Sequence, residues 1–131
     1  MNGSTRGRGA RIIPSAVFTD PQIGNVGLNE KEAKAKGVAC EVATMPFGSV
    51  ARAIEIDETA GILKVLVDPK SERLLGATIV GAEAGELIHM FLALMEAKGS
   101  VRAIVDAEMV HPAFAEGLQS VLMKLDRFAL K

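Results

Sequence analysis

A chain of 131 residues with a formal net charge of −1 is long enough for one domain with its own core, and carries no overall charge that would attract nucleic acid. Hydrophobic residues make up 49% of the sequence, yet no uninterrupted apolar stretch reaches the ~18 residues of a membrane-spanning helix. We therefore expect neither a nucleic acid nor a membrane as partner, and we attribute the apolar excess to a large protein–protein surface.

The N-terminus and the cysteine content favour the cytoplasm. Residues 1–11 are polar and glycine-rich, unlike a secretory signal, and the single cysteine, Cys40, precludes an internal disulfide. We interpret residues 1–11 as a flexible leader or as residues added by cloning, and residues 12–131 as the domain. The three arginines of the leader could alternatively form an RNA-binding arm, but the aromatic residues that stack on bases are missing from it.

Short apolar runs separated by turn residues predict strands in the first part of the chain. Residues 62–67 and 74–80 are expected to form a hairpin, because Asp68 and Pro69 between them supply turn chemistry. Residues 19–28 are rich in turn-forming residues and predict a loop. The remaining predicted strands are 12–18, 40–45 and 51–55.

A first helix is predicted over residues 30–36. Asn29 is a favourable N-cap, Glu32 completes a capping box three residues later, and Gly37 is suited to end the helix.

The second half of the chain is predicted to be helical. Apolar residues recur at helical spacing over 84–95 and again toward the C-terminus. The predicted helices are 84–95, 101–107 and 112–124. Because strands come first and helices follow, we expect an α+β fold in which an antiparallel sheet packs against helices.

The segment Val110–Leu118, which reads VHPAFAEGL, places an imidazole beside the start of the last helix. Pro112 lacks an amide donor and has φ fixed near the helical value, so we assign it to the first helical position. His111 would lie just outside the helix, where its ring can fold back toward Glu116. A carboxylate bound to one ring nitrogen fixes the tautomer and leaves the other nitrogen for proton transfer. The alternative is an ordinary surface histidine at a helix start.

Three further motifs occur in order along the chain. Ile13–Leu28 reads IPSAVFTDPQIGNVGL, Gly76–Gly81 reads GATIVG and Ala84–Ile88 reads AGELI. With the His-Pro segment, they resemble the C-terminal dimerisation (interface) domain of the pyridine nucleotide-disulfide oxidoreductases. The resemblance is greatest to the branch of flavoproteins that contains dihydrolipoamide dehydrogenase and mercuric reductase, and it extends over nearly all of the chain from Ile12 onward.

The resemblance implies a homodimer in which each subunit lends this domain to the active site of the other. His111 would be the general acid/base there, Glu116 would orient it, and the backbone at His111 and Pro112 would lie near the partner's flavin. The resemblance also implies cis peptide bonds before Pro21 and Pro112. FAD and NAD(P) would bind to the preceding domains of the full-length enzyme, and neither is expected on this chain alone.

The chain also departs from the family pattern. A Gly-x-Gly-x-x-Gly dinucleotide fingerprint and a redox cysteine pair are both missing from the sequence, so we expect the isolated chain to be inactive. Ala113 and Met109 stand where the family often has threonine and histidine, which loosens the match to dihydrolipoamide dehydrogenase. We expect no metal site, and we interpret His89 as a partly buried structural histidine. The alternative function is a free-standing, non-catalytic dimerisation or regulatory module.

Overall fold

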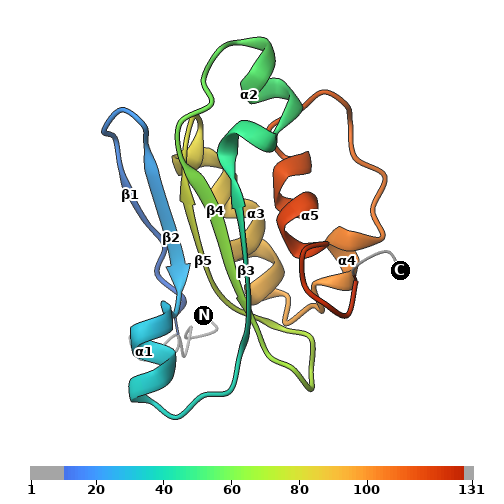
Figure 1. The fold of residues 1–131 in the computed structure, drawn as a ribbon. Helices are drawn as coiled ribbons and strands as arrows, with labels where there is room; N and C mark the ends of the chain where they lie inside the picture. The colour runs from blue at the N-terminus through green and yellow to red at the C-terminus, as the bar shows by residue number, and fades with distance from the viewer. Residues whose placement is uncertain (1–10, 129–131) are drawn as a thin grey trace, which may run out of the picture.

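Five antiparallel strands form the centre of the computed structural model, which describes residues 11–128 (Figure 1). Their order across the sheet is β1-β2-β5-β4-β3. The strands are β1 (Ser15–Val17), β2 (Ile23–Gly27), β3 (Glu41–Pro46), β4 (Ile62–Val67) and β5 (Leu74–Val80). The predicted α+β fold with an antiparallel sheet is confirmed. Residues 1–10 lie outside the described residues, so the predicted leader stays a prediction.

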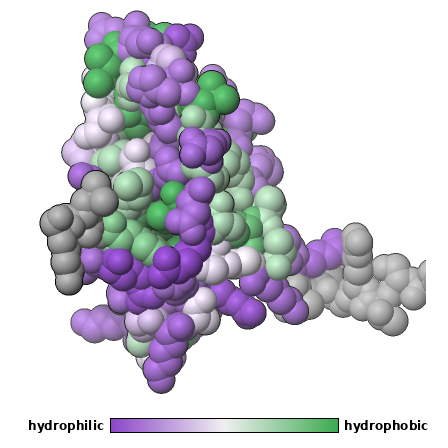
Figure 2. Space-filling view, turned by 90° about the vertical axis from the view of Figure 1, so that its right-hand side faces the viewer, coloured by the Kyte–Doolittle hydropathy of each residue, from purple (hydrophilic) through white to green (hydrophobic). Residues whose placement is uncertain are grey.

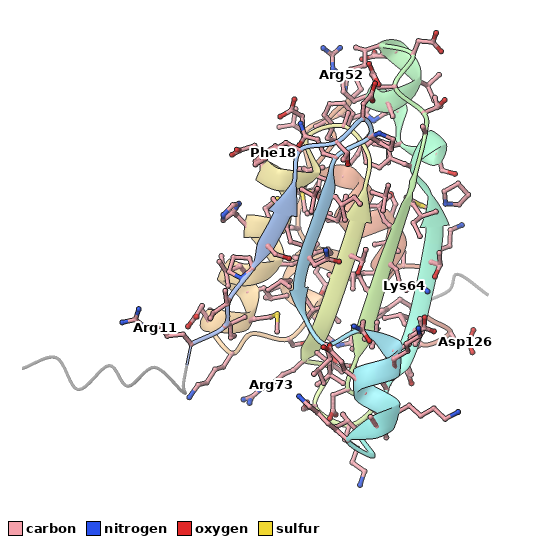
Figure 3. All side chains as sticks on the ribbon, turned by 90° about the vertical axis from the view of Figure 1, so that its left-hand side faces the viewer. Arg11, Phe18, Arg52, Lys64, Arg73 and Asp126 are labelled. Atoms are coloured by element: carbon pink, nitrogen blue, oxygen red, sulfur yellow. The ribbon has the colours of Figure 1, made fainter. Side chains whose placement is uncertain are left out.

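Two helices, α3 and α5, cover one face of this sheet. The helices are α1 (Glu30–Ala35), α2 (Ala51–Glu55), α3 (Ala84–Glu96), α4 (Arg102–Val105) and α5 (Glu116–Leu122), with a short 3-10 helix η2 (Phe47–Ser49). α3 packs against β2 and β5, while α5 packs against β3 and β4. The opposite face is turned toward the viewer in Figure 3, where α1 crosses its lower end. Among residues 11–128, no helix has both the length and the apolar character needed to span a bilayer.

The core lies between the sheet and the two covering helices. Alternate residues of a strand point to the same face, and in β4 Leu63, Val65 and Val67 are all fully buried on the helical side. Phe91 of α3 and Leu122 of α5 are equally buried against them. The apolar stripes that predicted the helices therefore form the interior of the domain, and they fix α5 against the sheet.

The predicted start of the first helix is confirmed in detail. The side-chain oxygen of Asn29 accepts a hydrogen bond from the Glu32 amide at 2.9 Å, and the Asn29 amide donates to the Glu32 carboxylate at 3.0 Å. Gly37 follows the helix with φ of +65°. The hairpin of β4 and β5, the strand β3 and the helices α3 and α4 also form close to their predicted positions.

Residues 51–55 form the helix α2, so the prediction of a strand is wrong there. Ala53 is buried between exposed neighbours, and it follows the buried Val50 by three residues. Arg52 and Glu55, also three apart, form an ion pair at 3.0 Å. A segment of five residues is too short for alternation to distinguish a strand from a single helical turn.

The predicted loop over residues 19–28 is also wrong in part, because it contains the strand β2. Gly24 and Gly27 suggested turns, but the structure uses Gly24 for close packing. A Cβ atom on Gly24 would overlap the backbone oxygen of Ala84 at the start of α3. Glycine lets this helix approach the strand closely, which no local pattern in the sequence reveals.

Gly76 and Gly37 allow steric overlap to be separated from backbone strain. A Cβ on Gly76 would overlap the Leu28 backbone, whereas nothing lies within 4 Å of a Cβ on Gly37, which has a positive φ. We expect Gly76→Ala to lower the free energy of unfolding by about 3 kcal/mol and Gly37→Ala by about 1 kcal/mol. Urea unfolding of the two variants measures the difference, and an equal or smaller loss at Gly76 would contradict the packing described here.

Candidate active site

The last helix begins later than predicted. α5 starts at Glu116, and Pro112 lies in the segment before it, so its assignment to the first helical position is wrong. The ring of Phe114 stacks on Phe47 with centroids 5.7 Å apart. This contact holds Phe114 against the core, in the segment that was expected to form the first turn of the helix. His111 nevertheless lies outside the helix, as predicted.

The ring of His111 folds back onto Glu116. Its Nδ1 lies 2.8 Å from Oε2 of the carboxylate, which confirms the contact expected from the sequence. The His111 side chain is 72% exposed, whereas that of Glu116 is only 16% exposed. An ionised carboxylate can only accept, so Nδ1 carries the proton in this contact and Nε2 is available to another group.

The peptide bonds before Pro21 and Pro112 are both cis, as the resemblance implies. Pro21 lies at the tip between β1 and β2 (Figure 1). A cavity of about 380 Å³ is lined by Pro21 and by Phe114, so the tip and the segment that follows His111 border the same hollow.

An ion-pair network fixes the helix that leads into the His111 loop. Arg102 of α4 donates to both oxygens of Glu72, through Nε at 2.8 Å and through Nη2 at 3.0 Å. Arg127 donates to Glu72 at 3.4 Å and to both oxygens of Glu41. The hydrogen bonds from Arg102 hold the pKa of Glu72 below its usual value. The network therefore ties α4 to the turn between β4 and β5.

Gln119 is a residue of this region that the sequence reasoning missed. Its amide nitrogen contacts the carbonyl oxygens of Ile104, Val105 and Ala107 at 2.7–3.0 Å. A glutamine within an amphipathic helix has no sequence signal that indicates such a role, since its acceptors lie more than ten residues away.

Other candidates stand apart from the His111 contact. His89 is exposed on α3, so its predicted partial burial is wrong; it occupies the outer side of the helix, next to the buried Ile88. Cys40 is half-buried just before β3. Within residues 11–128, no group of histidine, cysteine, aspartate and glutamate side chains is arranged to hold a metal ion.

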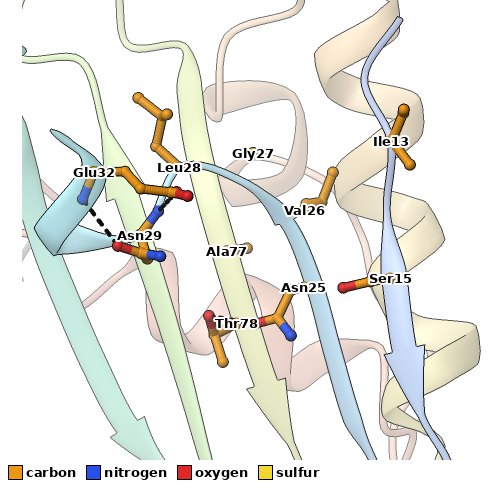
Figure 4. Close-up of a pocket in the computed structure, with 10 residues that line it drawn as sticks. All are labelled: Ile13, Ser15, Asn25, Val26, Gly27, Leu28, Asn29, Glu32, Ala77 and Thr78. Atoms are coloured by element: carbon orange, nitrogen blue, oxygen red, sulfur yellow. Dashed lines mark hydrogen bonds between the residues drawn. The ribbon is translucent and has the colours of Figure 1, made fainter. Parts of the chain in front are cut away.

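A second cavity, of about 320 Å³, opens between β1, β2, β5 and the start of α1 (Figure 4). Two of its polar side chains, Thr78 and Asn25, hydrogen-bond to each other at 2.9 Å. Asn29 and Glu32 form the capping box described above. These polar groups serve the fold, and the cavity lining includes neither His111 nor Glu116.

Comparison with known families identifies the domain. Residues 13–122 match the dimerisation domain of the pyridine nucleotide-disulphide oxidoreductases. The chain belongs to this family. The resemblance noted from the sequence motifs is therefore confirmed.

Individual relatives agree with this assignment. The chain is 38% identical to mycothione reductase of Mycobacterium tuberculosis over 88% of its own length and 25% of the relative's. It is 37% identical to dihydrolipoyl dehydrogenase 3 of Haloarcula marismortui over 82% of the chain and 23% of the relative. Its fold matches the HOCl-induced flavoprotein disulfide reductase RclA from Escherichia coli with a TM-score of 0.81 and 31% identity, over 85% of this chain and 26% of that one. The chain thus spans about a quarter of the length of these relatives.

The ion-pair network predicts how stability depends on pH. The pKa of Glu72 is lower in the folded chain than its ordinary value of 4.5. The ionised side chain therefore stabilises the fold fully above pH 4.5, and this stabilisation is lost as the pH falls through the pKa of the folded chain. We expect Glu72→Gln to lower the free energy of unfolding at neutral pH, and the difference from wild type to shrink steadily below about pH 5. Urea unfolding across this range measures it, with Glu96→Gln, at an exposed glutamate of α3, as control. A difference that does not depend on pH would contradict the ion-pair assignment.

Proposed function

We propose that this domain supplies His111 and Glu116 as the acid/base pair of a flavin-dependent disulfide oxidoreductase, acting in the active site of the opposite subunit. The observation that carries the proposal is the 2.8 Å contact between an exposed imidazole and a shielded carboxylate. An ordinary surface histidine has no need of such a partner. The family membership supports the same function, because its members named above are reductases and dehydrogenases.

Disulfide chemistry needs a group that exchanges protons near neutral pH. The thiolate is the nucleophile in thiol–disulfide exchange, so a proton has to leave the thiol before it attacks. In the proposed site, Nε2 of His111 accepts this proton, while Nδ1 stays hydrogen-bonded to Glu116. The carboxylate then lies beside the positive charge that the ring has gained. In the reverse step, Nε2 returns the proton to sulfur.

FAD and NAD(P) are assigned to the other domains of the full-length enzyme, where they would supply the electron-transfer chemistry. The described residues fit this division. His111 and Pro112 are both exposed at the surface of the domain, where their backbone can approach a flavin ring held by another chain. Their role toward the cofactor is therefore to border it.

Exposed apolar side chains support the proposal that other domains and a second subunit cover part of the surface. On the open face of the sheet, Ile23, Val80 and Ile62 pair side by side and form an apolar row across three strands. Hydrophobic side chains are also interspersed among polar ones on the face shown in Figure 2. The large hydrophobic residues that are exposed include Ile13, Val17, Phe18, Val42, Ile54, Ile56, Val110 and Met123. We propose a homodimer in which the FAD and NAD(P) domains of the same enzyme cover part of this surface.

The proposed substrate class is a small disulfide or dithiol. Dihydrolipoyl dehydrogenase and mycothione reductase are related to the chain at nearly equal identity, which supports this class rather than one particular substrate. We propose the cytoplasm as its location, because a single half-buried cysteine suits a reducing compartment.

The two histidines of the chain allow a matched test of the acid/base role. The 131-residue chain is combined with separately produced FAD and NAD(P) domains that carry the redox cysteine pair, and NAD(P)H-dependent disulfide reduction is measured. We expect His111→Ala to lower the rate by about 10²–10⁴-fold, the usual contribution of general acid–base catalysis. His89→Ala, at the exposed histidine on α3, should leave the rate unchanged.

Two outcomes would contradict this proposal. An active complex that is insensitive to His111→Ala would remove the acid/base role. A complex that forms but reduces no disulfide, even with the wild-type chain, would favour the free-standing dimerisation or regulatory module.

A further inference from the structure

We infer that Gln119 is a positioning residue that holds the His111 loop so that the ring reaches Glu116. The inference rests on the function proposed above, because the position of the ring matters only where His111 transfers protons. Gln119 itself touches neither ring nor carboxylate in the contacts described. Its effect would be exerted through the backbone at the start of the loop.

The carboxamide of Gln119 binds the end of α4. Its Nε2 lies 3.0 Å from the oxygens of Ile104 and Val105, and 2.7 Å from that of Ala107. The last carbonyls of a helix have no partner within the helix, and a side-chain amide is a suitable donor for them. Because Nε2 carries two hydrogens and meets three acceptors, at least one hydrogen is shared between neighbouring carbonyls. The side-chain amide of Gln119 therefore caps the C-terminal end of α4.

Helix α5 holds the His111 loop at two points, through Gln119 and through Glu116. The loop comprises residues 106–115. It begins after the end of α4, which Gln119 contacts, and ends where α5 starts at Glu116. Gln119 and Glu116 are three residues apart, so they lie on neighbouring positions of α5. One binds the start of the loop through Ala107, and the other binds the ring of His111 itself. A shift of Ala107 would be transmitted over only four residues to the ring.

The other side of the loop has its own anchor. Phe114, three residues after His111, is stacked on Phe47 and is half-buried. Between the two anchors Met109 is half-buried against the core, whereas Val110 is 79% exposed and His111 is 72% exposed. With Phe114 fixed against the core, the opposite end of the segment is held by the packing of Met109 and by the hydrogen bonds of Gln119, which are the polar contacts there.

The tautomer of the His111 ring reports directly on its pairing with Glu116. When Nδ1 donates to the carboxylate, the neutral ring carries its proton on Nδ1, whereas a ring released to water favours Nε2. Nitrogen-15 NMR of the ring nitrogens distinguishes the two forms in the full 131-residue chain. This readout does not require an active enzyme, and a general loss of stability would not change it while the chain stays folded.

Gln119→Met keeps the length of the side chain and removes its donors. We expect the Nδ1-protonated form of the neutral His111 ring to fall from the major to the minor population in this variant. Gln119→Glu, which keeps the shape and also loses the donors, serves as a second variant in case the first does not fold. The matched control is Gln22→Met, because Gln22 is half-buried and also binds backbone, accepting from the Gly85 amide at 3.3 Å.

The outcomes separate this inference from the proposed function. An unchanged tautomer in both Gln119 variants, or the same change in Gln22→Met, would overturn the positioning role. A tautomer change confined to the Gln119 variants supports it, whatever the enzyme assay shows. Full activity of His111→Ala in the reconstituted enzyme would contradict the proposed function alone, since the NMR measurement concerns only the pairing of two side chains.

Discussion

A single hydrogen bond between an exposed imidazole and a shielded carboxylate is the interaction on which the functional account depends. Without Glu116, the ring of His111 would be one more solvent-exposed side chain, free to rotate and to protonate either nitrogen. With Glu116 in contact, Nδ1 is bound to the carboxylate and Nε2 is left for another group. The chemistry proposed for the domain follows from that division between two ring atoms.

The rest of the fold keeps this contact in place. α5 carries Glu116, and Leu118 and Leu122 bury the same helix against the sheet. The loop that bears His111 is exposed, so its position depends on packing and hydrogen bonding at its two ends. The ion pair of Arg102 in α4 with Glu72 in the turn between β4 and β5 adds a further connection, and Arg127, which follows α5, contacts the same carboxylate. A packed core thus holds the exposed His111 at its rim, which is the arrangement that the proposed role in another subunit requires.

The sequence predicted those parts of the fold that local chemistry determines. The capping box at Asn29 and the contact of His111 with Glu116 each involve residues within five positions of one another, and both are present. Features that depend on distant partners were missed. The strand β2 requires Gly24 to accept the close approach of α3, and Phe114, in the segment before α5, packs on the distant Phe47. Neither long-range contact leaves a signal in the local pattern.

The central claim is that His111 acts across a subunit interface, and mixed dimers of a full-length enzyme containing this domain test it most directly. One subunit carries His111→Ala and the other lacks its redox cysteine pair, so each parent homodimer is inactive. If the acid/base pair serves the opposite subunit, the mixed dimer contains one complete site and disulfide reductase activity returns. If His111 serves its own subunit, neither site is complete; a mixed dimer as inactive as its parents would contradict the account.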